Sequence, residues 1–100
     1  MSDIIEKLVR TIRLRKEKDV KSSYTSFLLS KGTDFCLDKL KEELTELEDA
    51  IKNSENKVHE ATDVVYHLLV TLESSGIDFN DIKELKKRKG TSGFEEKKSR

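Results

Sequence analysis

Residues 58–72 constrain the fold of this chain most strongly, because apolar side chains recur there on nearly every side of the helix that they predict. One side carries Val58, Ala61, Val65, Leu68, Leu69 and Leu72, and the other sides carry Val64, Tyr66 and Val70. A helix that is apolar nearly all round has to be covered by protein. A chain of 100 residues that is 34% hydrophobic builds only a modest core. We therefore expect this segment to be the central, most buried helix, and a second copy of the chain to help cover it.

Two further helices are indicated by apolar residues that recur three and four positions apart. The first helix runs into a basic stretch at 13–16 and carries Ile4, Ile5, Leu8, Val9 and Ile12. The second is longer, stops near Asn53, and carries a leucine stripe of Leu37, Leu40, Leu44, Leu47 and Ile51. These stripes predict amphipathic helices that each bury one face.

Shorter elements separate and follow these helices. A short apolar segment at 24–29 ends at Gly32, which predicts a left-handed helix cap. Asp78 and Asp81 predict the start of a last helix with Ile82 and Leu85 facing inward. Proline is absent and glycine occurs four times, so long helices are favoured over sheets. We predict an all-α fold of four or five helices, with one domain at residues 1–89 and a polar tail at 90–100.

Charge and cysteine content limit the functional classes. Lys and Arg together number 20, as do Asp and Glu, so the chain has no net positive charge that would attract nucleic acid. No segment approaches the roughly 20 apolar residues that span a bilayer, so we expect no membrane partner. Cys36 is the one cysteine, which excludes an intrachain disulfide and favours a reducing cytoplasm.

Five carboxylates form two groups at helical spacing. Glu42, Glu43 and Glu46 lie on the second long helix, whereas Glu60 and Asp63 lie on the apolar helix. Because a short connection joins these helices, they are expected to be antiparallel neighbours. Carboxylates on an apolar helix lose hydration and repel one another unless a cation holds them ionised. Facing groups of this kind predict a cage of oxygen ligands for Mg²⁺ or Mn²⁺, which suggests phosphate chemistry.

A structural role is the alternative for these acidic groups. The first group would then lie on a solvated face, and Glu60 and Asp63 would form ion pairs with Lys39 or Lys57. With 20 acidic residues in 100, such spacings also arise by chance. Asp63, inside the apolar run, is the residue that this alternative explains worst.

Lys39 and His67 are candidates for contact with a substrate. Lys39 offers a point charge for phosphate, although an ion pair with Glu43 at i, i+4 is an equal alternative. His67 shares the helix face of Glu60 and Asp63, which favours a supporting or substrate-contacting role. A packed histidine that donates to a backbone carbonyl is the alternative for His67.

Three more candidates lie earlier in the chain. Tyr24 and Thr25 follow the basic stretch and can hydrogen-bond phosphate or ribose from a helix start. For Tyr24 the alternative is an apolar anchor. Arg15 belongs to the basic run at 13–16, which predicts either an anion-binding rim or a solvated surface.

More specific patterns accompany the acidic groups. They are Glu-Glu-x-x-Glu from Glu42, Glu-x-x-Asp from Glu60, Ser-Tyr-Thr at 23–25, Asp-x-x-Tyr-His-Leu-Leu-Val at 63–70, and Gly-Thr-Ser-Gly-x-Glu-Glu-Lys-x-Ser-Arg at 90–100. In these patterns the chain resembles the phosphoribosyl-ATP pyrophosphohydrolases, a family of the MazG-like all-α nucleotide pyrophosphohydrolases. Two positions depart from the family, since Lys41 stands where glycine is common and Thr62 where alanine is common.

The resemblance implies a MazG-like helical bundle completed by dimerisation. It implies Mg²⁺-dependent hydrolysis of phosphoribosyl-ATP to phosphoribosyl-AMP and pyrophosphate, the second step of histidine biosynthesis. Glu43, Glu46, Glu60 and Asp63 would be metal ligands, and Glu42 an auxiliary ligand or water-orienting base. The alternatives are a housecleaning pyrophosphohydrolase for other nucleoside triphosphates and a non-catalytic helical interaction protein.

Overall fold

The computed structural model describes residues 2–21 and 23–83. These residues form four α-helices and one short 3₁₀ helix, which are α1 (Ser2–Arg15), α2 (Tyr24–Lys31), α3 (Thr33–Asn53), α4 (Lys57–Ser74) and η1 (Phe79–Lys83). The described part of the chain contains no strand. The prediction of an all-α fold is therefore confirmed.

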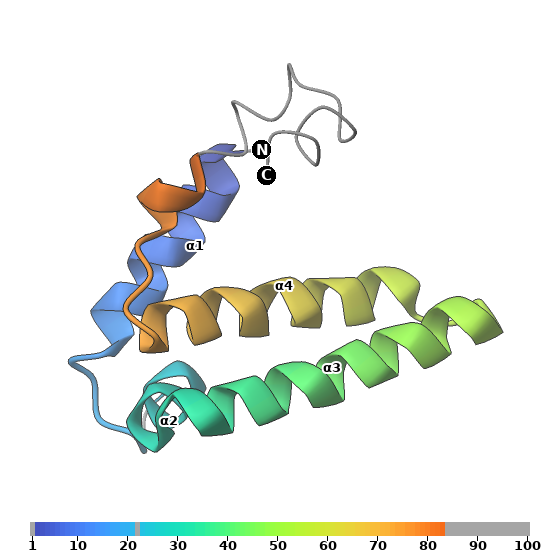
Figure 1. Ribbon diagram of the computed structural model, residues 1–100, viewed down its shortest axis with the longest axis horizontal. Coiled ribbons are helices and arrows are strands. Elements are labelled where there is room, and N and C mark those ends of the chain that lie inside the picture. Colours follow the sequence, from blue (N-terminus) through green and yellow to red (C-terminus); the bar gives the residue numbers. More distant parts are fainter. Residues whose placement is uncertain (1, 22, 84–100) are drawn as a thin grey trace, which may run out of the picture.

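A long antiparallel hairpin of α3 and α4 organises the molecule (Figure 1). A three-residue connection at 54–56 joins the two helices, as is typical of antiparallel neighbours. At the opposite end of the hairpin, α2 packs against both helices, and α1 crosses at a steep angle with η1 alongside it. The hydrophobic core lies at this end and contains Val9, Ile12, Leu28, Cys36, Leu69 and Val70.

The apolar helix is buried over only part of its length. Buried residues of α4 all lie in its C-terminal half and are His67, Leu69, Val70 and Thr71. Near its N-terminus, Val58 is 82% exposed, because α3 is the only described helix beside it there. The expectation of a central, most buried helix thus holds for the C-terminal half of α4 and is wrong for the N-terminal half within one chain.

The leucine stripe of α3 also lies differently from the expectation. Leu37, Leu44 and Ile51 are exposed, Leu40 and Leu47 are half-buried, and the buried residues of α3 are Cys36 and Ala50. The side of α3 that packs on α4 is therefore rotated by about one residue from the side that carries the exposed leucines.

Most predicted element boundaries are found in the structure. Gly32 has the positive φ of 92° expected of a cap, but its ψ of 172° is extended, so the chain passes directly from α2 into α3. Asp78 caps the next turn, because its carboxylate accepts a hydrogen bond of 2.9 Å from the backbone N–H of Asn80. The helix that follows is the 3₁₀ helix η1 as far as it is described. Leu85 and the tail at 90–100 lie outside the described residues, as does the predicted boundary at 89. Among the described helices, none is long and apolar enough to cross a membrane.

Candidate active site

The α3–α4 hairpin brings carboxylates of both helices together. Glu43 and Glu46, one turn apart on α3, and Glu60, in the first turn of α4, each place one oxygen atom within 4.8 Å of the others. The antiparallel arrangement produces this meeting, since the middle of α3 lies beside the first turns of α4. The two groups predicted from sequence therefore form one site in space, which we call the carboxylate cluster.

Asp63 joins the cluster through a second set of ligand atoms. His59, Glu60 and Asp63 also lie within 4.8 Å of one another, so Glu60 belongs to both sets. The Nε2 atom of His59 is 3.4 Å from Oδ2 of Asp63. Sequence reasoning missed His59, although its position directly before Glu60 and four residues before Asp63 placed it on the same face.

Two oxygen atoms of the cluster are suited to bind a positive charge. Oε2 of Glu43 and Oε2 of Glu60 are buried and accept no hydrogen bond from any described residue. Burial raises the pKa of Glu43, and the neighbouring carboxyl of Glu46 and the charge of Asp63 raise it further. Buried oxygen atoms without partners cost free energy, and carboxylate oxygens are the ligands that Mg²⁺ prefers. The donor set therefore fits a hard divalent cation.

The alternative of a purely structural role requires Lys39 or Lys57 to pair with Glu60 or Asp63, and the structure shows other pairs. Nζ of Lys39 pairs with Oε2 of Glu42 at 3.2 Å and lies 5.6 Å from the centre of the Phe35 ring. Among the described residues, neither Lys39 nor Lys57 pairs with Glu60 or Asp63. The predicted alternative of a Lys39–Glu43 pair is likewise wrong. Glu42, which precedes Glu43 in the sequence, is exposed.

His67 lies buried next to the cluster. Its Nδ1 atom is 2.9 Å from the backbone carbonyl of Asp63, so this nitrogen carries the proton and donates. Nε2 then faces the hydroxyl of Tyr24 at 3.5 Å, the outer limit of a hydrogen bond. The geometry matches the packed histidine that the sequence left as an alternative. Direct contact of His67 with a substrate stays a prediction.

Tyr24, Thr25 and Arg15 lie near His67 and Tyr66 of α4. Tyr24 is 53% exposed, so the alternative of an apolar anchor does not hold. The hydroxyl of Thr25 hydrogen-bonds that of Tyr66. Burial raises the pKa of Tyr66, while the Thr25 hydroxyl and the nearby charge of Arg15 act in the opposite direction. The predicted substrate residues other than Lys39 thus form one group with Tyr66, whose part in the site sequence reasoning had missed.

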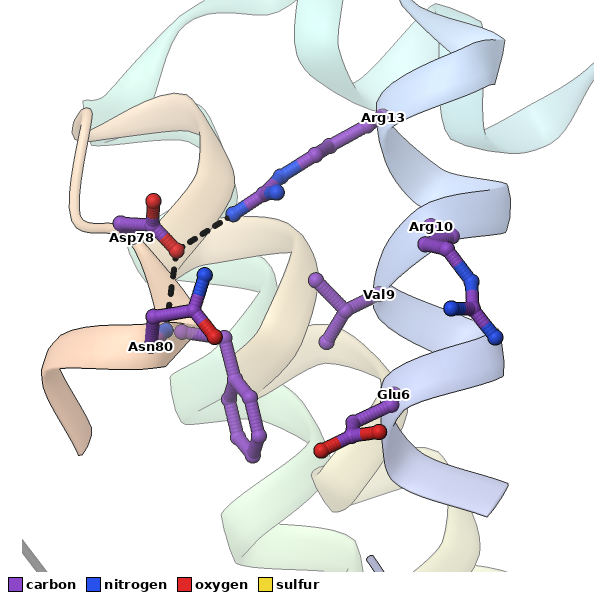
Figure 2. Close-up of a pocket in the computed structure, with 7 residues that line it drawn as sticks. Glu6, Val9, Arg10, Arg13, Asp78 and Asn80 are labelled. Atoms are coloured by element: carbon purple, nitrogen blue, oxygen red, sulfur yellow. Dashed lines mark hydrogen bonds and ion pairs between the residues drawn. The ribbon is translucent and has the colours of Figure 1, made fainter. Parts of the chain in front are cut away.

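Open space is present near the cluster and elsewhere. A cavity of about 170 Å³ at the loop end of the hairpin is lined by Asp49, Ala50, Asn53, Glu55, Asn56 and Glu60. A separate cavity of about 250 Å³ lies between α1 and η1 (Figure 2) and is lined by Glu6, Val9, Arg10, Arg13, Asp78, Phe79 and Asn80. In this second cavity Nη2 of Arg13 already pairs with Asp78 at 2.7 Å. None of the candidate site residues lines it, so we do not assign it to the active site.

Comparison with known proteins agrees with this geometry. Residues 5–89 match the family of phosphoribosyl-ATP pyrophosphohydrolases. A phosphoribosyl-ATP pyrophosphatase of Dechloromonas aromatica is 43% identical over 98% of this chain and 94% of its own length. Another, of Geobacter metallireducens, is 45% identical over 98% of this chain and 93% of its own length.

A longer relative also contains a similar segment. A histidine biosynthesis bifunctional protein of Wolinella succinogenes is 43% identical over 97% of this chain, which covers 44% of that protein. No solved structure is significantly similar to this one. The family match over most of the chain and the full-length relatives lead to one conclusion: the chain belongs to the phosphoribosyl-ATP pyrophosphohydrolase family.

Proposed function

We propose that this protein hydrolyses the α–β phosphoanhydride of phosphoribosyl-ATP to phosphoribosyl-AMP and pyrophosphate, in the second step of histidine biosynthesis. The observation that carries the proposal is the meeting of Glu43, Glu46 and Glu60. Two of these residues have a buried oxygen atom that accepts no hydrogen bond within the described part of the chain. Family membership supports the choice of substrate. The buried thiol of Cys36 is consistent with a cytoplasmic enzyme.

The carboxylate cluster would hold the cation that the reaction uses. Glu43, Glu46, Glu60 and Asp63 offer oxygen ligands for Mg²⁺, with Mn²⁺ as an acceptable substitute. When bound, the cation supplies positive charge that offsets the charge of the triphosphate and favours attack by water.

Glu42 is the carboxylate best placed to handle the proton of the attacking water. It adjoins Glu43 in the sequence and is exposed, so a proton that it accepts can pass to bulk solvent. Its present partner is Lys39. A substrate phosphate that draws Lys39 away would leave the Glu42 carboxylate free to accept a proton.

The remaining residues would bind and orient the nucleotide. Arg15 and Lys39 carry positive charge for phosphate groups, and Thr25 offers a hydroxyl. Tyr24 is exposed, and the buried His67 would help to fix the position of the Tyr24 ring. The full site would belong to a homodimer, because the apolar side chains of the hairpin are exposed in one chain.

Pyrophosphate release tests the proposal. Phosphoribosyl-ATP, ATP and dCTP are compared with Mg²⁺, with Mn²⁺ and with EDTA. We expect release from phosphoribosyl-ATP to exceed that from the other two by orders of magnitude, and EDTA to abolish it. Equal rates on all three substrates would favour the housecleaning alternative. No release from any of them would favour the non-catalytic interaction protein.

A further inference from the structure

Tyr24 presents an aromatic ring at the surface although the helix that carries it is firmly packed. In α2, Ser26 and Leu28 are buried, whereas Tyr24 is 53% exposed. A single exposed aromatic residue is common and marks no site by itself. Its surroundings therefore decide whether the ring has a function.

The ring is held in one orientation by several neighbours. It lies edge-on to the imidazole of His67, with 6.1 Å between ring centres, and its hydroxyl faces Nε2 of that histidine. It is nearly parallel to the rings of Phe27 and Tyr66, at interplanar angles of 22° and 21°. An exposed ring that is already fixed loses little conformational entropy when a ligand stacks on it.

The position of the ring suits the base of a nucleotide. His67 links Tyr24 to the turn of α4 that carries Asp63, since Nδ1 of His67 donates to the Asp63 carbonyl. His67 is also an electrostatic neighbour of Glu43. One ribose joins the base of a nucleotide to its phosphates, so a nucleotide whose phosphates lie at the cluster has its base within reach of this ring.

Tyr24 is 53% exposed, and the centres of the nearly parallel Phe27 and Tyr66 rings lie 6.2 Å and 6.5 Å from the centre of its ring, too far apart for close face-to-face contact. Its hydroxyl lies 3.5 Å from Nε2 of His67, and Nδ1 of that histidine donates to the Asp63 carbonyl. Aromatic faces stack on nucleobases, and larger purines stack more strongly than pyrimidines. We infer that Tyr24 is the stacking platform for the purine ring of the substrate, and thereby a specificity residue. This inference rests on the proposed binding of a nucleotide at the carboxylate cluster.

Tyrosine fluorescence offers a direct test, because the chain contains two tyrosines and no tryptophan. In Tyr66→Phe the sole emitter is Tyr24, and in the matched control Tyr24→Phe the sole emitter is Tyr66. Both are titrated with AMP, with CMP and with ribose 5-phosphate in Mg²⁺ buffer, and the control corrects for light absorbed by the bases. We expect AMP to quench Tyr24 to saturation, CMP to quench it less and ribose 5-phosphate not at all.

Calorimetric titration of two variants adds an independent readout. Tyr24→Ala should raise the Kd for AMP about tenfold and leave that for ribose 5-phosphate unchanged, whereas Tyr24→Phe should keep most of the AMP affinity. The inference is overturned if AMP quenches Tyr24 no more than it quenches the control, or if Tyr24→Ala weakens both ligands equally. Pyrophosphate release by the unaltered protein separates the two proposals, since hydrolysis without quenching would refute the platform alone.

Discussion

Glu43 is the residue at which the need for a cation is clearest. Its side chain is partly buried, and the pKa of its carboxyl is raised by that burial, by Glu46 and by Asp63. A carboxyl whose pKa is raised by folding favours the folded state below its unfolded pKa of about 4.5. That contribution is lost as the pH rises through the raised pKa. Without metal, the contribution of Glu43 to the free energy of unfolding should therefore decrease as the pH rises from acid towards neutrality.

Neutralising one carboxylate of the cluster should move activity and stability in opposite directions. Glu46→Gln and Asp63→Asn each remove a negative charge that acts on Glu43. In EDTA at neutral pH we expect the folded state to gain about 0.5 kcal/mol, as for relief of a like-charge pair. With Mg²⁺, each variant should lose activity by about a hundredfold. Thermal melts with EDTA and with Mg²⁺, beside a pyrophosphate assay, measure both effects.

Glu48→Gln is the matched control for these variants. Glu48 lies on the same helix but pairs with Lys52 outside the cluster. It should change neither the activity nor the pH dependence of stability. Near wild-type turnover of Glu46→Gln or Asp63→Asn at saturating Mg²⁺ would exclude that residue as an essential ligand, and the same result for both would refute the metal site.

Individual site residues differed in how far sequence could place them. Glu43 and Glu46 were predictable as a pair, because residues three apart share a helix face whatever the tertiary structure. Their meeting with Glu60 followed from the short connection between the helices. The exposure of Tyr24 was not predictable, because it depends on how α2 docks rather than on the pattern within α2. The suggested ion pair of Lys39 with Glu43 was wrong, because the Lys39 side chain reaches both Glu42 and Glu43 along the helix and pairs with Glu42.

At the scale of elements, the α3–α4 connection carries backbone strain that a glycine would remove. Ser54 and Asn56 both have φ values of 54°. Asparagine tolerates the left-handed region better than serine. Ser54→Gly should therefore stabilise the protein by about 0.5 to 1 kcal/mol, and Asn56→Gly should stabilise it less. Urea unfolding of the two variants beside the wild type measures the difference. Destabilisation by Ser54→Gly would show that the Ser54 side chain, not its backbone, matters there.

A charge network fastens α1 to the end of α4. The carboxylate of Glu73 pairs with Arg13 at 3.1 Å and with Lys16 at 2.6 Å. Burial by itself would raise the pKa of Glu73, but hydrogen bonds from Lys16 and Arg13 outweigh it and hold the pKa below its usual value. A lowered carboxyl pKa contributes stability above the unfolded pKa, and this stability is lost as the pH falls through the folded pKa.

Glu73→Gln should therefore destabilise the protein at neutral pH and much less in acid. The side chain is 13% exposed, so two cations would lose a largely buried partner, at a cost of about 2 kcal/mol. Urea unfolding at neutral pH and below the unfolded pKa of about 4.5 measures the change. Glu17→Gln, at an exposed position near the end of α1, is the control. An equal loss at both pH values would mean that shape, not charge, holds α1 in place.

The helices themselves were predictable because their signals are local. Spacing of apolar residues, a glycine at 32 and the cap at Asp78 all act within one or two turns. The buried side of α3 was not predictable from its leucine stripe, since it depends on what α4 presents to it. The pairing of Arg13 with Glu73, 60 residues away, leaves no trace in the local pattern.

At the scale of the whole molecule, the hairpin exposes large apolar side chains along both of its helices. Exposed positions recur seven residues apart on both helices, at Leu37, Leu44 and Ile51 on α3 and at Val58 and Val65 on α4. Spacing of this kind is typical of helices that pack lengthwise against other helices. Two hairpins from two copies of the chain would form a four-helix bundle and cover these residues.

We therefore predict a homodimer that depends on this apolar surface. Light scattering at micromolar concentration should give about twice the chain mass of 11.5 kDa. Leu44→Asp places a charge in the predicted interface and should give a monomer, because an unpaired charge is costly to bury. Leu14→Asp is the control, since Leu14 is equally apolar and 69% exposed but lies on α1, not among the exposed apolar residues of α3 and α4. It should remain a dimer. A wild-type monomer with full activity would refute the prediction, because the apolar surface would then have no partner in the working enzyme.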